Sequence, residues 1–568
     1  MDTLMSGLNR SLNGVYSRRL QRTLIFIAAA GVAFGQAPRI FSRAIFNAAS
    51  FAPAGVPGGS IAQGSMLSIF GTNLGPAKGV PASSFPLQTS LSGVSLTFTE
   101  GGQSVNLIPL YVSAGQINAI MPSNAGIGLG SLQVTYNNLK SNFSPMQVVA
   151  SSFGIFAVGG SGMGPGAVHN FVTQANQPLN SLQTTAAPGD TVTIYGTGLG
   201  PITAPDNVAP PAGSLPVTVE AWVGGQTASV AYSGRSPCCS GLDQIVLNIP
   251  KNVPQGCWVP IYFRTAGAVT SNAVTVAIDP KRAPCSDPNN PLTHIFTTGG
   301  TGGTLRLTKS SVHEDVATLA PVDAATDMFT YDLRNLPGGP FVFSPLLSQP
   351  PAGSCTVFEF AGDYWGLNGG FPSPLVQVSY LDTGTFTASG SVSGDLAPAV
   401  SGGFGAFLGS NLSPYFPSQL TINPGTAKLT SNGGTDVPSF SSTITIPQPF
   451  TWTGRDELTT IPRSQPLTLS WTGLPSGQQM SILGGNVDLP SNSSALFYCV
   501  APVGASSFVI PNAVLEFVPA TRADLRASKG LLYLVNSSPG NGIPVHASGI
   551  KTAVALAVYM FGKTVIFQ

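Results

Sequence analysis

The sequence predicts an all-β protein built from tandem immunoglobulin-like β-sandwich domains. Three observations predict this fold class. Charged residues make up only 8% of the chain, against about 25% in a typical soluble protein. Glycine (67) and proline (49) together form about a fifth of the 568 residues. Short runs of β-branched and aromatic residues alternate with Gly/Pro turns, as strands of a sandwich do.

The composition also excludes several classes of protein. Too few Glu, Lys and Arg residues are present to form a coiled coil. The chain has 24 Lys+Arg and 23 Asp+Glu, a net charge of +1, so no basic face for nucleic acid is expected. Without residues 1–35 the chain holds 20 basic and 22 acidic residues. This balance near −2 weakens the case for any polyanionic partner.

Residues 1–35 are predicted to be a signal peptide that is cleaved on export. Four arginines (Arg10, Arg18, Arg19, Arg22) precede an apolar run over residues 24–33. Small residues then flank a cleavage site at 33–35. A membrane-spanning helix needs about 20 apolar residues, so we expect no membrane span after cleavage. The predicted location is extracellular, at the cell surface or periplasmic, and the general and twin-arginine routes both stay open.

An internal duplication is the most informative feature of the sequence. Residues 64–76 read GSMLSIFGTNLGP and residues 189–201 read GDTVTIYGTGLGP, with seven of thirteen positions identical. Two further pairs follow in the same order: Gly115-Gln116-Ile117 matches Asp243-Gln244-Ile245, and Ser141-Asn142 matches Ser271-Asn272. Three ordered matches predict two copies of one β-sandwich module, over residues 44–152 and 153–280.

Each copy can be divided into strands and turns. Residues 66–70 and 191–195 are predicted strands, because they are β-branched or apolar runs bounded by glycine. The GTNLGP and GTGLGP segments that follow are predicted turns, in which Gly and Asn can adopt positive φ. The pairs Gly101-Gly102 and Gly224-Gly225 are predicted to be two-residue hairpin turns.

The first half resembles an uncharacterised secreted-domain family that is abundant in Acidobacteria of the Solibacter type. The residues that carry the resemblance are FNAASF at 46–51, the paired GTNLGP and GTGLGP segments, LYVSAGQIN at 110–118 and the SNAVTV ending. The GTxLGP segment also looks like the IPT/TIG immunoglobulin-like domain. The resemblance covers about residues 44–280 and implies a fold and an exported location, but no catalytic residues. The chain departs from the family in placing the module N-terminally and in adding Cys238, Cys239 and Cys257.

The second half shows no further copy of the module. Residues 281–303 are predicted to be a linker because they are rich in Pro, Gly and Thr, with Gly302-Gly303 as a turn signal. Residues 304–445 are predicted to be a β-rich domain and residues 446–568 a sandwich-like domain. Whether 304–568 is one domain or two stays open. The apolar residues 552–561 are predicted to be a core strand.

Six cysteines suit an exported protein with disulfides. Because adjacent cysteines rarely bond to each other, we expect one of Cys238 and Cys239 to pair with Cys257 and the other with Cys285. Cys355 and Cys499 are either free or paired with each other. No C-x-x-C spacing occurs and no histidine lies near the cysteines, so no metal site is predicted. No Gly-rich loop leads into a helix with a lysine, and no cofactor is predicted.

The sequence contains no recognisable catalytic constellation, and a non-enzyme is predicted. The four histidines are far apart in sequence, and no G-x-S-x-G motif is present. The most interesting polar cluster is Glu359 and Asp363 beside Tyr364 and Trp365, because two acids and two aromatic rings could bind a sugar. Its alternative interpretation is a core strand that ends in a turn.

Three functions from different classes are considered on these observations. The first is a non-catalytic modular protein with a structural or adhesive role, whose partners are other surface proteins or glycans. The second is carbohydrate binding by the second half, through Glu359, Asp363, Tyr364 and Trp365, with Trp452 or Trp471 as further stacking surfaces. A hydrolase whose site is not recognisable from sequence is the third and weakest possibility.

Overall fold

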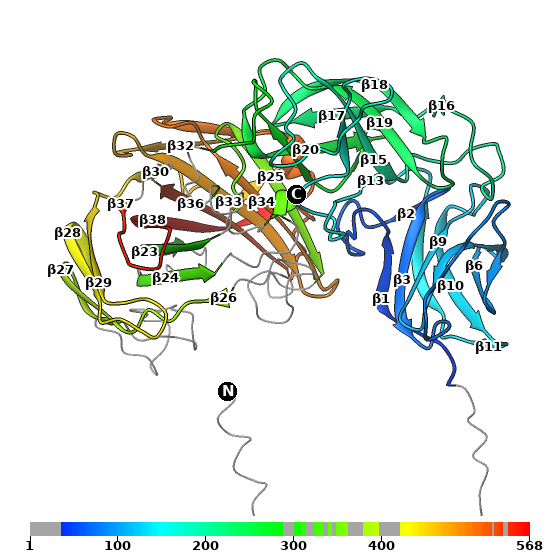
Figure 1. Ribbon diagram of the computed structural model, residues 1–568, viewed down its shortest axis with the longest axis horizontal. Helices are drawn as coiled ribbons and strands as arrows, with labels where there is room; N and C mark the ends of the chain where they lie inside the picture. The colour runs from blue at the N-terminus through cyan, green and yellow to red at the C-terminus, as the bar shows by residue number, and fades with distance from the viewer. Residues whose placement is uncertain are drawn as a thin grey trace, which may run out of the picture. The chain divides into compact units, whose positions relative to one another are not determined.

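Strands account for nearly all of the regular structure, which confirms the predicted all-β class of tandem immunoglobulin-like sandwiches (Figure 1). The computed structural model describes residues 36–287, 293, 300–313, 322–332, 339–343, 348–361, 379–396, 421–524, 528–537 and 543–568. Within these residues the helical elements longer than one residue are the short helix α2 (Asn512–Leu515) and the 3-10 turn η1 (Gly339–Phe341). No helix in that part of the chain is long and apolar enough to cross a membrane.

The first module consists of two sheets packed face to face. The first sheet has the order β1-β3-β9-β8-β4 and the second the order β2-β12-β10-β6-β5, with β7 beside β6 and β11 beside β10. The strands are β1 (Arg39–Asn47), β2 (Ile61–Ala62), β3 (Met66–Thr72), β4 (Val80–Pro81), β5 (Ser90–Leu91), β6 (Val94–Glu100), β7 (Gln103–Asn106), β8 (Ile108–Val112), β9 (Gln116–Ile120), β10 (Gly128–Tyr136), β11 (Leu139–Lys140) and β12 (Ser144–Val149).

Alternation along the strands fills the space between these sheets. In β6, Val94, Leu96 and Phe98 are buried, while the residues between them are partly exposed. They pack with Ile69 and Ile117 of the opposite sheet in one apolar cluster. Period-two patterning therefore determines which face of each strand becomes core.

The second module repeats this arrangement, but one long strand joins its two layers. The order is β13-β15-β19-β18-β17-β20-β21, with β14 beside β15, β16 beside β18 and β22 beside β20. β18 contains a bulge; it pairs with β17 before the bulge and with β19 on both sides of it. In the first module these two pairings are made by separate strands, since β7 pairs with β6 and β8 pairs with β9. The strands are β13 (Gly154–Ile155), β14 (Val168–Asn170), β15 (Thr191–Thr197), β16 (Gly213–Ser214), β17 (Val219–Val223), β18 (Gln226–Arg235), β19 (Asp243–Asn248), β20 (Gly256–Thr265), β21 (Val269–Thr270) and β22 (Val274–Ile278).

The predicted turns of both copies are confirmed. Gly101 and Gly102 have φ of 54° and 80°, and Gly224 and Gly225 have φ of 57° and 79°. Positive φ at both central positions is the requirement of a tight type I′ hairpin. Each pair joins two antiparallel strands, β6 to β7 and β17 to β18.

The third part of the chain is centred on a ten-stranded sheet. Its order is β25-β34-β33-β36-β38-β23-β24-β26, with β31 and β37 beside β38, and two three-stranded sheets, β27-β28-β29 and β30-β32-β35, accompany it. The strands are β23 (Thr301–His313), β24 (Val322–Asp332), β25 (Ser354–Ala361), β26 (Ser379–Tyr380), β27 (Phe386–Leu396), β28 (Thr421–Ser431), β29 (Phe440–Ile446), β30 (Thr451–Thr453), β31 (Thr460–Ile461), β32 (Leu467–Thr472), β33 (Gln479–Asp488), β34 (Ser493–Val500), β35 (Ser507–Ile510), β36 (Ser528–Ser537), β37 (Ile543–Pro544) and β38 (Thr552–Phe567).

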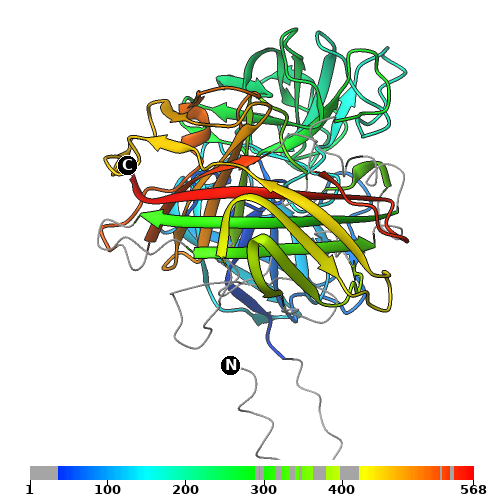
Figure 2. The same ribbon diagram turned by 90° about the vertical axis from the view of Figure 1, so that its left-hand side faces the viewer.

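Two sequence expectations about the second half need correction. Gly302 and Gly303 were expected in a linker turn, but both lie inside β23, which pairs in parallel with the C-terminal strand β38 (Figure 2). The expected boundary at 445/446 does not separate sheets either, because strands from both sides of it belong to the same ten-stranded sheet. Residues 552–561 do form the expected core strand, as part of β38.

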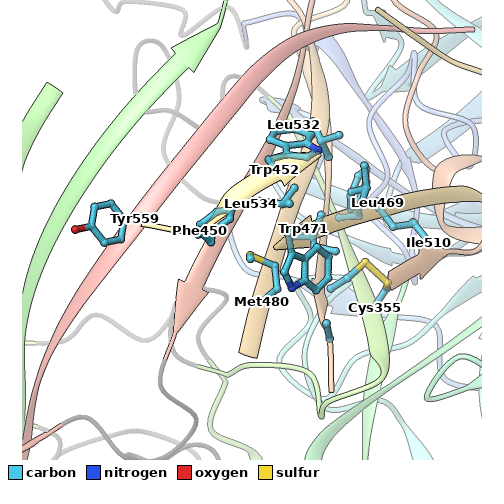
Figure 3. Close-up of a cluster of buried hydrophobic side chains, with 14 of the residues drawn as sticks. Cys355, Phe450, Trp452, Leu469, Trp471, Met480, Ile510, Leu532, Leu534 and Tyr559 are labelled. Atoms are coloured by element: carbon cyan, nitrogen blue, oxygen red, sulfur yellow. A yellow bond between two sulfur atoms is a disulfide. The ribbon is translucent and has the colours of Figure 1, made fainter. Parts of the chain in front are cut away.

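Trp452 and Trp471 belong to the core of this third part. They lie opposite each other on β30 and β32 and are 6% and 1% exposed. Figure 3 shows both side chains in one apolar cluster with Leu469, Met480 and Leu532. The Trp471 indole N–H donates to the Ala505 carbonyl oxygen at 2.8 Å. Neither ring is available as a stacking surface for a sugar, so that expectation is wrong.

Replacement of Trp471 by alanine tests this assignment. We expect Trp471→Ala to lower the free energy of unfolding of the third part by about 3–5 kcal/mol, because it removes a large buried ring and leaves a cavity. Denaturation in guanidinium, followed by circular dichroism, measures the loss. Val509→Ala on the neighbouring strand is the control, since Val509 is 51% exposed. Equal effects of the two substitutions would contradict the buried position of Trp471.

Candidate functional site: the junctions between modules

A buried ion pair closes a loop of the second module beside the first module. Arg235 ends β18 and Asp243 begins β19, and they stand opposite each other in the ladder. The Arg235 guanidinium bonds to the Asp243 carboxylate, and both side chains are almost fully buried. Residues 236–242 form the loop between them, and any side chain at Gly241 would contact Met66 and Ile120 of the first module. The loop therefore packs directly on its neighbour.

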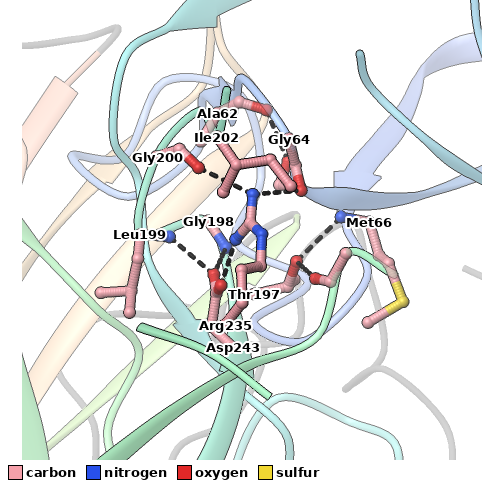
Figure 4. Close-up of polar contacts among 12 residues, drawn as sticks. Ala62, Gly64, Met66, Thr197, Gly198, Leu199, Gly200, Ile202, Arg235 and Asp243 are labelled. Carbon is pink, nitrogen blue, oxygen red and sulfur yellow. Dashed lines mark hydrogen bonds and ion pairs between the residues drawn. The ribbon is translucent and has the colours of Figure 1, made fainter. Parts of the chain in front are cut away.

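Asp243 also fixes the GTGLGP turn. Its Oδ2 accepts hydrogen bonds from the backbone N–H groups of Gly198 at 2.7 Å and Leu199 at 2.8 Å (Figure 4). Burial raises the pKa of Asp243 above its ordinary value, while the Arg235 charge and these N–H donors act in the opposite direction. The carboxylate thus joins the turn, the loop base and the guanidinium in one polar cluster.

Arg235 connects this polar cluster to the first module by hydrogen bonds. Its Nη2 donates to the carbonyl oxygens of Gly64 at 2.9 Å and Gly200 at 2.7 Å. Thr197 makes a parallel bridge, because its hydroxyl accepts from the Met66 N–H at 2.8 Å and donates to the Gly241 carbonyl at 2.6 Å. Backbone groups of one module thus find their hydrogen-bond partners on side chains of the other. Buried backbone N–H and C=O groups need such partners.

Two further pairs extend this junction. Asp206 of the second module accepts from the Ser123 N–H and from its hydroxyl, both at 2.7 Å. Leu87 and Asn207 exchange two hydrogen bonds, one between backbone groups at 2.8 Å and one from the Asn207 amide at 3.3 Å. The junction is polar along its length and uses few charges.

A second junction joins the second module to the third part. Arg264 on β20 donates to Glu220 of its own module and, through Nη1, to both carboxylate oxygens of Glu516 at 3.2 and 3.1 Å. Hydrogen bonding to Glu220 is the main reason that the pKa of Arg264 is raised. Glu516 directly follows α2, so this short helix supplies the partner for a charge on the neighbouring module.

Aromatic rings pack beside that ion pair. The Trp222 and Tyr262 rings stack with centroids 5.5 Å apart, and Phe517 meets Tyr262 edge-on at 5.5 Å. The Arg264 guanidinium lies 5.4 Å from the Trp222 centroid, within range of a cation–π interaction. The second junction therefore combines apolar burial with charge pairing.

The first module and the third part also touch. Arg43 donates through Nη2 to the Pro490 carbonyl oxygen at 2.5 Å, and Ala52 and Val56 pack against Ala495 of β34. Each of the three parts of the chain thus contacts the other two.

The predicted ligand-binding cluster is only partly described. Glu359 lies on β25, while Asp363, Tyr364 and Trp365 lie outside the described residues. The Glu359 side chain as a whole is partly exposed, but both carboxylate oxygens are buried and have no hydrogen-bond partner. This burial raises the pKa of Glu359 to about 8. Glu359 is thus on the expected core strand.

The disulfide pairing differs from the expectation. Cys257 and Cys285 bond to each other, and Cys238 bonds to its neighbour Cys239. The expected pairing is wrong because Cys257 and Cys285 are brought together in an apolar cluster with Trp258, while Cys238 and Cys239 are exposed in the loop between β18 and β19. Cys355 and Cys499 form the third bridge, between the facing strands β25 and β34.

Sequence reasoning missed the Arg235–Asp243 pair, although the duplication contained a signal for it. Asp243 occupies the position that Gly115 holds in the first copy. In that copy the Leu74 N–H donates to the Ala114 carbonyl instead, and the space where a Cβ of Gly115 would lie is empty. A glycine in one copy and an aspartate in the other marks the site where the second copy makes a contact that the first copy lacks.

Comparisons with known proteins add little at this level of similarity. No protein-family model and no curated protein matches the chain. One matching solved structure is the plexin A4 extracellular region, with 16% identity and a TM-score of 0.17, where the match covers 46% of this chain and 19% of that one. A second is SGBP-B of a Bacteroides ovatus mixed-linkage glucan utilization locus, in complex with a heptasaccharide, with 11% identity, a TM-score of 0.13, and coverage of 85% of this chain and 94% of that one. A third is the fragment with domains 4–9 of the surface layer protein SbsC, with 11% identity, a TM-score of 0.16, and coverage of 88% of this chain and 64% of that one. The chain spans about a fifth of the plexin region and just under two thirds of the SbsC fragment. No ligand or activity transfers from matches with such low scores.

Loss of Arg235 should be costly. We expect Arg235→Ala to destabilise the chain by about 3–5 kcal/mol, because Asp243 is left as a buried and uncompensated charge. Calorimetric or denaturant unfolding measures the change. The control is Arg282→Ala, which removes an ion pair with Asp190 in the same module, where Arg282 is 62% exposed. An exposed pair contributes at most about 1 kcal/mol, so similar losses in the two variants would refute the importance of burial.

Titration of Glu359 should make stability depend on pH. Its pKa lies near 8 in the folded chain and near its ordinary 4.5 when exposed. The folded chain therefore binds more protons between these values, and stability falls as pH rises through that window. We expect the Tm of the parent chain to fall further from pH 5 to pH 9 than that of Glu359→Gln. The exposed Glu457→Gln is the control, and parallel Tm curves for the parent and Glu359→Gln would contradict the burial.

Proposed function

We propose that this chain is an exported, non-catalytic structural protein of the cell surface or extracellular space. In this role its tandem β-sandwich modules serve in display, adhesion or spacing of other components. The observation that carries the proposal is the construction of the junctions, in which Arg235, Arg264 and Arg43 each reach from one module to a neighbour.

Such junctions support a fixed arrangement of modules. Modules joined only by a linker move relative to each other by default. Here the Gly64 carbonyl and the Met66 N–H of the first module find their partners on the second. Separation of the modules would leave Arg235 and Thr197 without these partners. A rigid multi-module body suits a protein that holds a ligand or partner at a set distance from a surface.

The non-catalytic role rests on the chemistry of the available acids. Glycoside hydrolysis needs two carboxyl groups that face one bond. Buried Asp243 is engaged by Arg235, and buried Asp488 by Arg522. Screening of the chain with general esterase and glycosidase substrates tests this part of the proposal. Turnover that Glu359→Gln abolishes would overturn it.

The location is tested separately. Expression in a bacterial host, followed by fractionation and protease treatment of intact cells, shows whether the chain leaves the cytoplasm. Cleavage after residue 35, read by N-terminal sequencing, is the expected result. Retention of the intact chain in the cytoplasm of its native host would remove the proposed surface role.

Spin-label distances test the fixed arrangement. All six cysteines are in disulfides, so cysteines introduced at exposed Gln103 and Ala231 would be the only free thiols. We expect a narrow distance distribution between labels on the first and second modules. Arg235→Ala should broaden it, whereas Arg282→Ala should not. A broad distribution in the parent chain would contradict a rigid junction.

A further inference from the structure

One end of the first module exposes three large apolar side chains in a small area. Phe41 is 47% exposed, Leu139 40% and Phe143 67%. Asn142 binds both the N–H and the carbonyl oxygen of Ile40, at 2.9 and 3.3 Å. Phe41 and Phe143 each follow one of these bonded residues, and Leu139 lies three residues before Asn142. We call Phe41, Leu139 and Phe143 the β1–β11 patch.

The patch lies where the chain enters the module. β1 begins at Arg39, and residues 37–568 form a unit distinct from the first 36 residues. Figure 1 places the start of β1 and the β10–β11 hairpin at the same end of the first module. Both rings stand on segments that the core holds in place, since Ile40 and Ser144 beside them are buried. Their exposure is therefore a property of the folded module.

The charge around the patch is positive. Residues 36–152 contain four basic residues, Arg39, Arg43, Lys78 and Lys140, and one acid, Glu100. Residues 153–568 contain 16 basic and 21 acidic residues, so the positive charge is specific to the first module. Arg39 and Lys140 flank the patch and are exposed.

The single acid of the module lies far from the patch. The Glu100 carboxylate lies beside Gly126 and Gly128, at the first residue of β10. Leu139 lies opposite Tyr136, the last residue of that strand, while Phe143 precedes Ser144, which lies opposite Leu132 in the middle of the strand. At about 3.3 Å per residue, β10 separates the Glu100 end from Leu139 by more than about 20 Å and from Phe143 by about 15 Å. Arg39, Lys140 and the β1–β11 patch thus lie apart from the acid.

From this arrangement we infer that the β1–β11 patch docks on an anionic lipid surface. Exposed apolar side chains enter the boundary between headgroups and acyl chains, and flanking Arg and Lys side chains bind the anionic headgroups. A second copy is a poorer occupant, because a symmetric contact would bring two positively charged patches together. The inference deepens the proposed function by naming the surface to which the rigid modules attach.

Vesicle sedimentation with the chain from Ala37 onward tests the inference. This form lacks the apolar residues 24–33, so they cannot cause binding. We expect it to sediment with phosphatidylcholine vesicles that contain phosphatidylglycerol, and to do so at least about tenfold less with phosphatidylcholine alone or in 0.5 M salt. Vesicle binding is measured on purified protein and does not depend on where the cell places the chain. Failure to bind vesicles would therefore contradict the docking inference but not the proposed structural role. A cytoplasmic location would contradict the proposed function but not the vesicle result.

Variants identify the surface that binds. Phe41→Ser with Phe143→Ser, and separately Arg39→Glu with Lys140→Glu, should each reduce sedimentation at least about tenfold. Val503→Ser with Val509→Ser is the matched control, since these exposed residues lie on the third part, and it should bind as the parent does. Unchanged circular dichroism and Tm establish folding, and Phe143→Ser alone serves if the double variant unfolds.

Three outcomes would overturn the inference. They are absence of vesicle binding by the parent chain, equal loss in the Val503/Val509 control, and sedimentation velocity showing a dimer that the Phe41/Phe143 variant dissociates. The last result would mean that a second copy covers the patch.

Discussion

The buried ion pair between Arg235 and Asp243 is the interaction on which the junction of the first two modules depends. A charge removed from water needs a partner of opposite sign and enough hydrogen bonds to replace its hydration. Asp243 obtains them from Arg235, Gly198 and Leu199. Because the same guanidinium also binds a carbonyl of the first module, the fold of one module and its contact with the other rest on one set of atoms.

The low charge of the chain has a structural consequence at these junctions. Surfaces with few charges can pack against each other with little desolvation cost, and the charges that remain can be placed where they bridge modules. Arg264 illustrates this, since it binds Glu220 within its module and Glu516 across the boundary. By contrast, the exposed ion pair of Arg282 with Asp190 lies within the second module and bridges nothing.

Local features were predictable because they depend on a few adjacent residues. Gly101-Gly102 and Gly224-Gly225 form hairpins because a type I′ turn needs positive φ at both central positions, which glycine adopts readily. The GTNLGP and GTGLGP turns follow from the same rule, with Asn73 and Gly198 at equivalent positions and both at positive φ. The apolar C-terminal run became β38 for a similarly local reason, its strand-forming composition.

The sequence by itself determined the all-β class, the turns and many of the strands, because each is set by patterns within about ten residues. It also showed the duplication, because the two copies keep matching segments. Only the tertiary structure decided which cysteines bond, that Trp471 is core, that Gly302 and Gly303 join β23 to the C-terminal strand, and that Arg235 bridges two modules. Apart from the bond between the adjacent Cys238 and Cys239, these contacts join residues far apart in the chain, as with Gly64 and Arg235 or Cys355 and Cys499. Such contacts form only when surfaces from distant parts of the chain meet in space, and a pattern of neighbouring residues does not show which surfaces will meet.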